Sequence, residues 1–138
     1  MQERNKIYFA SDFHLGAPNK KESLIREKKI CRWLDSIKDN AKEIYLVGDV
    51  FDFWFEYRHV IPTGFERFKG NLVNMTDQGV KIHFFPGNHD LWTFGYLERE
   101  LGLIVHSTPL ITTINNKTFY ITHGDGIGTG DMKYKFLK

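Results

Sequence analysis

The chain has 138 residues, of which 41% are hydrophobic and 26% are charged, and its formal net charge is +2 at pH 7. These values predict a single soluble globular domain that can bury a core. The charge is too small to indicate nucleic-acid binding, and no apolar run approaches the length that spans a membrane. The N-terminus has no apolar signal-peptide core, and Cys31 is the only cysteine, so we expect a reduced, cytoplasmic setting.

Apolar runs that alternate with amphipathic stretches predict an α/β fold. The strands expected in chain order are residues 7–11, 43–47, 80–85, 103–105, 110–114 and 117–122. The helices expected between them are residues 20–39, 62–78 and 93–101. In the first helix, Ile30, Trp33 and Ile37 follow one another at three- and four-residue steps and form part of an apolar stripe. Asn115-Asn116 predicts a tight hairpin turn, because asparagine tolerates the left-handed conformation that such turns need.

Residues 51–57 hold five aromatic side chains, too many for one buried face of a short loop. Two interpretations stay open. The aromatic rings line a groove or a lid, or they cap the end of the sheet as part of the core.

Metal-type ligands follow four of the apolar runs. The four polar blocks are Asp12-Phe13-His14, Gly48-Asp49, Gly87-Asn88-His89-Asp90 and His123-Gly124-Asp125. Ligands of open α/β sheets bind at the carboxyl ends of the strands, so we expect a site at this edge. Asp12 and His14 occupy positions i and i+2, which point to the same side of extended backbone and can reach one ion.

Carboxylate, amide and imidazole ligands together suit Mn²⁺, Fe or Zn²⁺ rather than an all-oxygen Ca²⁺ site. Asp49 is the candidate to bridge two ions, which about 3.5–4 Å apart would clamp the attacking and leaving oxygens at phosphorus. Any one block alone could be a turn residue or a core histidine, but the four together favour a metal site. His59, His83 and His106 lack this context, and we expect them to be structural or surface histidines.

The blocks resemble those of the calcineurin-like metallophosphoesterases, which read D-x-H, G-D-x-x-[DE], G-N-[HR]-[DE], H-G-D and G-H-x-H. The second block here runs from Gly48 to Asp52. The resemblance implies a two-sheet β core flanked by helices, with two divalent ions, most simply Mn²⁺. It implies one ion on Asp12, His14 and Asp49, and the other on Asp49, Asn88 and His123. It also implies that His89 contacts the reacting phosphate and that Asp90 orients His89.

Within this family the chain is most similar to the bacterial UDP-2,3-diacylglucosamine hydrolases, over residues 12–16, 48–54 and 123–137. That resemblance implies cleavage of the pyrophosphate of a UDP-linked diacyl sugar, which yields UMP and a lipid phosphate. It also implies peripheral contact with the cytoplasmic face of the inner membrane. The candidate contacts with this substrate are Phe53, Trp54, Asn88, His89 and Asp125.

Two departures from these hydrolases leave alternatives open. Several of them have arginine where His89 stands, so action on another phosphomonoester or phosphodiester remains an alternative. The chain ends at Lys138, before the G-H-x-H block, so we expect residues 1–138 to be the amino-terminal portion of a larger metallophosphoesterase domain. A non-catalytic metal- or nucleotide-binding module on the same scaffold is the other alternative. For the isolated chain we expect weak, partial or absent metal binding and negligible hydrolysis. We also expect self-association through apolar surface left uncovered near residues 119–122 and 133–138.

Overall fold

The computed structural model describes residues 3–124, which form two sheets and three helices. The larger sheet is parallel, with strands in the order β1 (Lys6–Ala10), β2 (Ala41–Val47), β3 (Lys81–Phe85) and β4 (Ile104–Val105). The smaller sheet is the antiparallel hairpin of β5 (Leu110–Ile114) and β6 (Lys117–Ile121). The helices are α1 (Lys20–Ile37), α2 (Glu66–Asp77) and α3 (Tyr96–Leu101).

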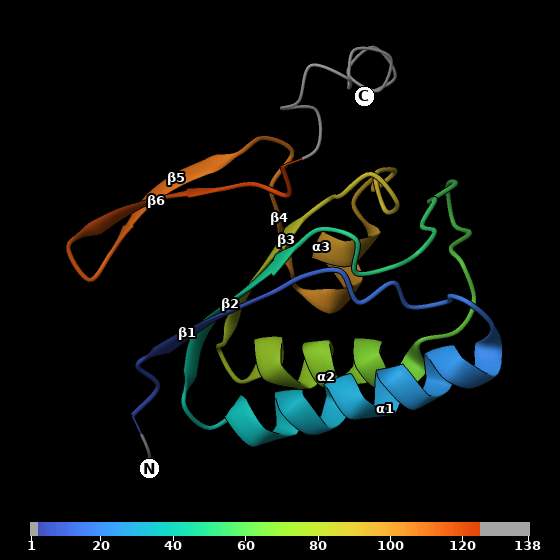
Figure 1. Ribbon diagram of the computed structural model, residues 1–138, viewed down its shortest axis with the longest axis horizontal. Helices are drawn as coiled ribbons and strands as arrows, with labels where there is room; N and C mark the ends of the chain where they lie inside the picture. The colour runs from blue at the N-terminus through green and yellow to red at the C-terminus, as the bar shows by residue number, and fades with distance from the viewer. Residues whose placement is uncertain (1–2, 125–138) are drawn as a thin grey trace.

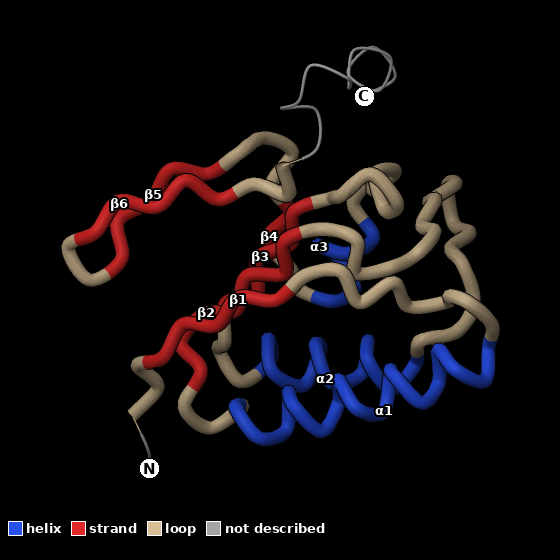
Figure 2. The backbone as a smooth tube through the Cα atoms, viewed as in Figure 1, coloured by secondary structure: helices blue, strands red, loops and turns tan. Residues whose placement is uncertain are grey.

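Helices α1 and α2 lie side by side along one side of the parallel sheet, as Figure 1 shows. The β5–β6 hairpin extends away from the helices at the opposite side, which is clear in the tube drawing of Figure 2. The predicted α/β fold with two sheets and flanking helices is therefore confirmed, and the structure shows that one sheet is parallel and the other a small antiparallel hairpin.

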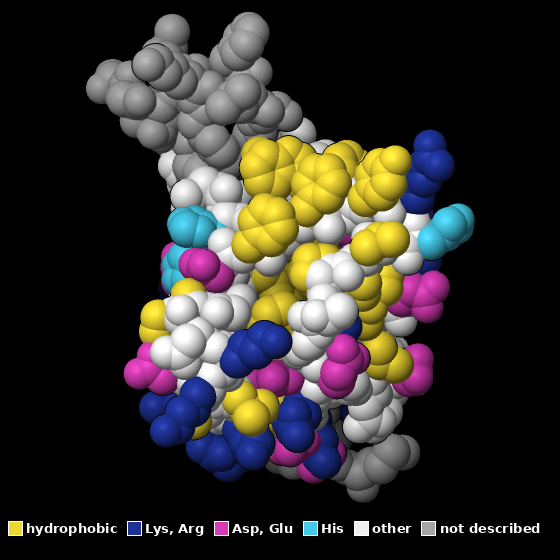
Figure 3. Space-filling view, turned by 90° about the vertical axis from the view of Figure 1, so that its right-hand side faces the viewer, with side chains coloured by type: hydrophobic (Ala, Val, Ile, Leu, Met, Phe, Trp, Pro, Cys, Tyr) yellow, Lys and Arg dark blue, Asp and Glu magenta, His cyan; other side chains and the backbone are white. Residues whose placement is uncertain are grey.

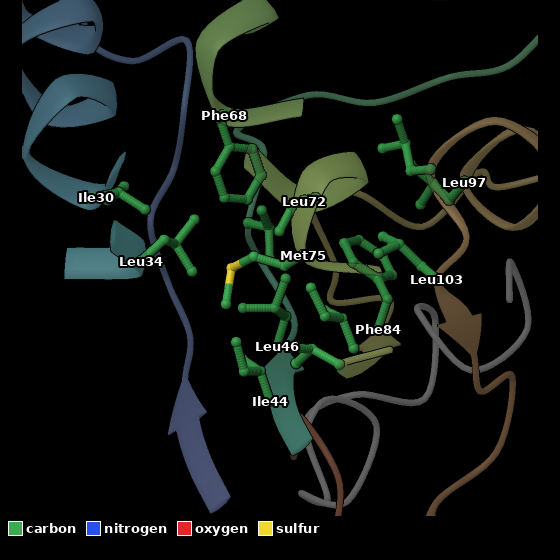
Figure 4. Close-up of a cluster of buried hydrophobic side chains, with 14 of the residues drawn as sticks. Ile30, Leu34, Ile44, Leu46, Phe68, Leu72, Met75, Phe84, Leu97 and Leu103 are labelled. Carbon is green, nitrogen blue, oxygen red and sulfur yellow. The ribbon is translucent and has the colours of Figure 1, made fainter. Parts of the chain in front are cut away.

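The main core lies between the parallel sheet and the helices, because each helix buries one stripe of apolar side chains against the sheet. Figure 4 shows this packing, in which Leu34 of α1 and Met75 of α2 face Ile44 and Leu46 of β2. A second, smaller cluster joins the other face of the sheet to the hairpin, where Tyr45, Phe85 and Ile121 are buried together.

Two helices begin later than the sequence pattern predicts. Helix α2 begins at Glu66 rather than at residue 62, because Gly64 and Phe65 adopt positive φ values of 102° and 63°, which no right-handed helix accommodates. Helix α3 begins at Tyr96 rather than at residue 93, because Gly95 has a φ of 106°. The predicted turn at Asn115-Asn116 is present, with φ values of 49° and 64°.

The loop after β2 combines both interpretations of its aromatic residues. Phe51 and Trp54 are buried in the core, whereas Phe53, Phe55 and Tyr57 are exposed. Cys31 is buried in α1, and burial raises the pKa of its thiol. No helix among residues 3–124 is long and apolar enough to cross a bilayer.

Candidate metal centre

The carboxyl ends of β1, β2 and β3 meet at one edge of the parallel sheet, so the polar blocks that follow them lie together. Backbone hydrogen bonds join the first two blocks directly. The amide of Asp12 donates to the carbonyl of Gly48, and the amide of His14 donates to the carbonyl of Asp49, each at 3.0 Å.

The backbone of this edge is not extended, contrary to the sequence-based argument for Asp12 and His14. Both residues have positive φ values, 60° and 45°, and Asp49 has 52°. Their side chains still converge, because Nε2 of His14 lies 3.7 Å from Oδ1 of Asp12 and 3.7 Å from Oδ2 of Asp49. The shared approach therefore comes from left-handed turns and not from the pleat of a strand.

Two groups of possible ligand atoms share the buried carboxylate of Asp49. One group is His14, Asp49 and His89, and the other is Asp12, Asp49 and His123, and the atoms within each group lie within 4.8 Å of one another. Oxygen Oδ2 of Asp49 lies 3.7 Å from Nε2 of His14 and 3.3 Å from Nε2 of His123. A carboxylate between two imidazoles has the geometry that a bridging ligand needs.

His123 is oriented by the strand it faces. Its Nδ1 lies 2.9 Å from the carbonyl oxygen of Val47, and because a carbonyl only accepts, Nδ1 carries the proton and Nε2 keeps its lone pair. Nε2 also lies 3.3 Å from Oδ1 of Asn88, so the predicted amide ligand lies beside His123. Gly48 makes this approach possible, since a Cβ atom there would overlap the His123 ring.

Asp52 is a site residue that the sequence reasoning missed as a functional group. Its Oδ1 lies 3.2 Å from Nδ1 of His14 and 3.5 Å from Nδ1 of His89, and its backbone carbonyl lies 3.0 Å from the same atom of His89. Asp52 therefore orients both imidazoles. Its place as the last residue of the Gly48–Asp52 block was the available signal.

The structure corrects the role expected of Asp90. Its carboxylate accepts hydrogen bonds from backbone amides rather than holding the His89 ring, which is oriented by Asp52. Asp90 is fully buried, and burial raises the pKa of its carboxyl, against the opposing effect of the N–H groups of Gly87, Phe51 and Asp49.

The residues predicted to contact the substrate differ in their exposure to solvent. Trp54 is 0% exposed and donates from Nε1 to the Glu56 carboxylate at 2.9 Å, so it belongs to the core and the expectation of substrate contact was wrong. Phe53 is 60% exposed beside the site. Asp125 lies outside the residues that the structure describes.

A cleft of about 310 Å³ opens beside His123. Its walls combine aromatic side chains of the loop after β3 with hydroxyl side chains of the loop after β4, including Trp92, Phe94, Ser107 and Thr108. Of the candidate metal ligands, His123 lines this cleft, whose apolar and polar surfaces together are typical of ligand sites.

The profile of the calcineurin-like phosphoesterases matches residues 5–137, nearly the whole chain. The chain belongs to this family.

Relatives carry a more specific name. A UDP-2,3-diacylglucosamine hydrolase of Porphyromonas gingivalis is 48% identical over 122 residues, which cover 88% of this chain and 47% of the relative. A hydrolase of the same name from Histophilus somni is 26% identical, and the match covers 94% of this chain and 53% of the relative. Another from Vibrio vulnificus is 29% identical, and the match covers 70% of this chain and 39% of the relative. The chain spans about half the length of the curated relatives it matches.

Family membership agrees with the chemistry of the donor set. Calcineurin-like phosphoesterases use divalent metal ions, and the carboxylate, imidazole and amide groups gathered here fit such ions. Asp49 belongs to both ligand groups.

Proposed function

We propose that this site is the metal centre of a pyrophosphohydrolase that cleaves UDP-2,3-diacylglucosamine to UMP and a lipid 1-phosphate, as in lipid A biosynthesis. The observation that carries the proposal is the buried Asp49 carboxylate, which lies between the imidazoles of His14 and His123. The substrate comes from the name shared by the relatives.

In this proposal, two divalent ions, Mn²⁺ first and Fe or Zn²⁺ as alternatives, are held by the five predicted ligands. The ligands are Asp12, His14 and Asp49 for one ion, and Asp49, Asn88 and His123 for the other. When bound, such ions lower the pKa of a water and add positive charge at the reacting phosphate.

His89 is the catalytic residue proposed to contact the phosphate. Its ring is partly exposed at the mouth of the site, and its Nδ1 faces the backbone carbonyl of Asp52, which leaves Nε2 free for the substrate. With Nδ1–H donating to that carbonyl, Nε2 accepts a hydrogen bond in the neutral ring, and in the imidazolium form it can donate one to a phosphoryl oxygen or give a proton to the leaving group. Asp90 acts through the backbone and not on the phosphate.

The acyl part of the substrate is proposed to lie over exposed aromatic rings next to the site, and Asn88 and His89 to face its phosphates. Phe53, Phe55 and Phe94 are all exposed. Figure 3 shows hydrophobic side chains gathered on the upper part of the face where the loop after β2 lies. Apolar rings beside a polar site suit a lipid substrate and peripheral contact with the inner membrane from the cytoplasm.

The test is release of UMP from UDP-2,3-diacylglucosamine, measured in the protein as its gene encodes it, with Mn²⁺ and with chelator. We expect Mn²⁺-dependent UMP release that is lost on Asp49→Ala. Hydrolysis of a cyclic nucleotide or a simple phosphomonoester, with none of the UDP-lipid, would assign the protein to another phosphoesterase activity. Metal binding without hydrolysis of either class would assign it to a non-catalytic module.

A further inference from the structure

We infer that Asp90 is a positioning residue that fixes Asp49 and Asn88 relative to each other, and that metal affinity depends on it. This inference rests on the proposed metal centre. Asp90 itself contacts neither a candidate ion position nor the substrate, and acts only through the backbone of the two turns that carry the ligands.

The first observation is the set of partners of its carboxylate. Oδ1 accepts from the amides of Asp49 at 3.1 Å and Gly87 at 2.7 Å. Oδ2 accepts from the amides of Val50 at 2.8 Å and Phe51 at 3.2 Å. One buried side chain thus binds the turn after β2 and the turn after β3 together. All four partners are donors, so only an ionised carboxylate satisfies every contact.

The second observation is that the turn after β2 needs an external constraint. Gly48 and Asp49 have φ values of 84° and 52°, and a left-handed aspartate is less stable than an extended one. The amide of Asp49 itself donates a hydrogen bond to the carboxylate of Asp90. The hydrogen bonds therefore hold Asp49 in the conformation that directs its carboxylate toward His14 and His123.

The third observation is that the turn after β2 and the turn after β3 are in direct, close-packed contact. The amide of His89 donates to Oδ1 of Asp49 at 3.0 Å. A Cβ atom at Gly87 would overlap the Asp49 carboxylate. Any displacement of one turn against the other would therefore move the carboxylate that both ligand groups share.

The substitution Asp90→Asn tests this role, because the amide keeps the shape but replaces one acceptor oxygen with a donor that faces backbone N–H groups. Glu56→Gln is the matched control. Glu56 is also a buried carboxylate that accepts from backbone amides, those of Phe94 at 2.8 Å and Tyr96 at 2.9 Å, but it joins no metal-binding turn. Both variants should lose stability in urea unfolding with chelator present.

The two variants should differ in Mn²⁺ binding by the folded protein, followed by the electron paramagnetic resonance signal of free Mn²⁺. We expect Asp90→Asn to bind Mn²⁺ about tenfold or more weakly, the range typical of residues that orient metal ligands, and Glu56→Gln to bind it as the parent does. Equal Mn²⁺ affinity in Asp90→Asn and the parent would overturn the inference.

Asp49→Ala separates this result from failure of the proposed site. If Asp49→Ala also binds Mn²⁺ like the parent, the metal centre itself is wrong. If Asp90→Asn does not fold, Asp90→Glu decides, because the added methylene keeps the charge but shifts the carboxylate from the four backbone amides. Parent-like Mn²⁺ affinity in Asp90→Glu would then overturn the inference.

Discussion

At the scale of single residues, the candidate metal centre concentrates negative charge on a carboxylate that is removed from water. Asp49 is buried and lies between two imidazoles, so a divalent ion would compensate its charge more fully than a neutral histidine does. Metal binding and stability of the folded chain should therefore be linked.

We expect Mn²⁺ to raise the melting temperature of the chain, because a ligand that binds only the folded state stabilises it by mass action. Asp49→Ala should remove this shift, whereas Asp35→Ala, at an exposed position of α1, should keep it. Thermal unfolding with and without Mn²⁺ measures both. An unchanged shift in Asp49→Ala would show that the metal binds elsewhere.

His89→Ala should lower the turnover of the UDP-lipid by about 100-fold or more, the range typical of a lost general acid or base. Mn²⁺ affinity should change far less, because His89 is assigned to the phosphate. Steady-state kinetics and Mn²⁺ titration are the two measurements, with the exposed His59→Ala as control. A loss of Mn²⁺ affinity as large as the loss of turnover would make His89 a ligand, which its place in the group with His14 and Asp49 allows.

The sequence predicted which side chains lie together at the sheet edge better than it predicted their contacts with one another. Blocks at strand ends predicted which side chains gather, because a parallel sheet brings those ends to one edge. The division of work between Asp52 and Asp90 depends on which carboxylate is buried against backbone amides. Which carboxylate is buried in this way depends on tertiary contacts, which cannot be predicted from the spacing or the type of the residues.

At the scale of elements, the contact between β3 and the segment after β4 contains a histidine pair apart from the metal centre. Nδ1 of His83 lies 2.8 Å from Nε2 of His106, and the buried Nε2 of His83 has no hydrogen-bond partner among the described residues. The Tyr45 ring stacks on His83 at 4.2 Å, and Glu43 and Lys81 are the nearby charged groups. The expectation that these histidines are structural agrees with this packing.

Burial lowers the pKa of both His83 and His106, so the unfolded chain binds more protons than the folded chain just below the ordinary histidine pKa of 6.5. The stability that the neutral pair contributes is therefore complete above pH 6.5 and is lost as the pH falls below it. His106→Phe should flatten the pH dependence of the unfolding free energy by up to about 1.4 kcal/mol per pH unit, the value for one proton.

Urea unfolding between pH 5 and pH 8 with chelator measures this effect, and His59→Gln, at an exposed position, is the control. Identical slopes in His106→Phe and His59→Gln would show that the pair does not titrate as its burial requires.

Element boundaries were predictable where side-chain pattern decides them and not where backbone conformation does. The apolar stripe of α1 and the hairpin turn at Asn115-Asn116 were both visible in the sequence. The later start of α2 was not, because Phe65 is a common helical residue that here adopts a left-handed conformation. Only its tertiary surroundings, including the packing of its ring against Phe51, distinguish the two states.

At the scale of the whole molecule, the two sheets leave apolar surface open on the side away from the helices. Ile111 and Tyr120 are opposite one another on β5 and β6 and are 69% and 60% exposed. Between the sheets, a hollow of about 290 Å³ is lined by Phe9, Val47 and Phe119, among others. Apolar surface of this kind favours association with a second copy.

We expect the isolated chain to self-associate at micromolar or higher concentration through the β5–β6 hairpin. Tyr120→Lys should shift the equilibrium toward the monomer, because it places a charge in the contact. Ile25→Lys, at an equally exposed apolar position on α1, should not. Sedimentation equilibrium over a range of concentrations distinguishes the two variants, and a monomeric parent at all concentrations would contradict the proposal.

The left-handed backbone conformation has opposite effects on folding and on ion binding. At Asp12, His14 and Asp49 it lowers the stability of the fold but places the side chains that bind the ions. Glycine at these positions would relieve a conformational cost of roughly 1–3 kcal/mol each, but it would remove the groups that hold the ions. A relative that did not bind the ions would not need these side chains, and glycine at the three positions would then relieve the conformational cost. Glycine in place of one of these ligands in a homologous sequence would then indicate, from the sequence alone, that the homologue has lost metal binding.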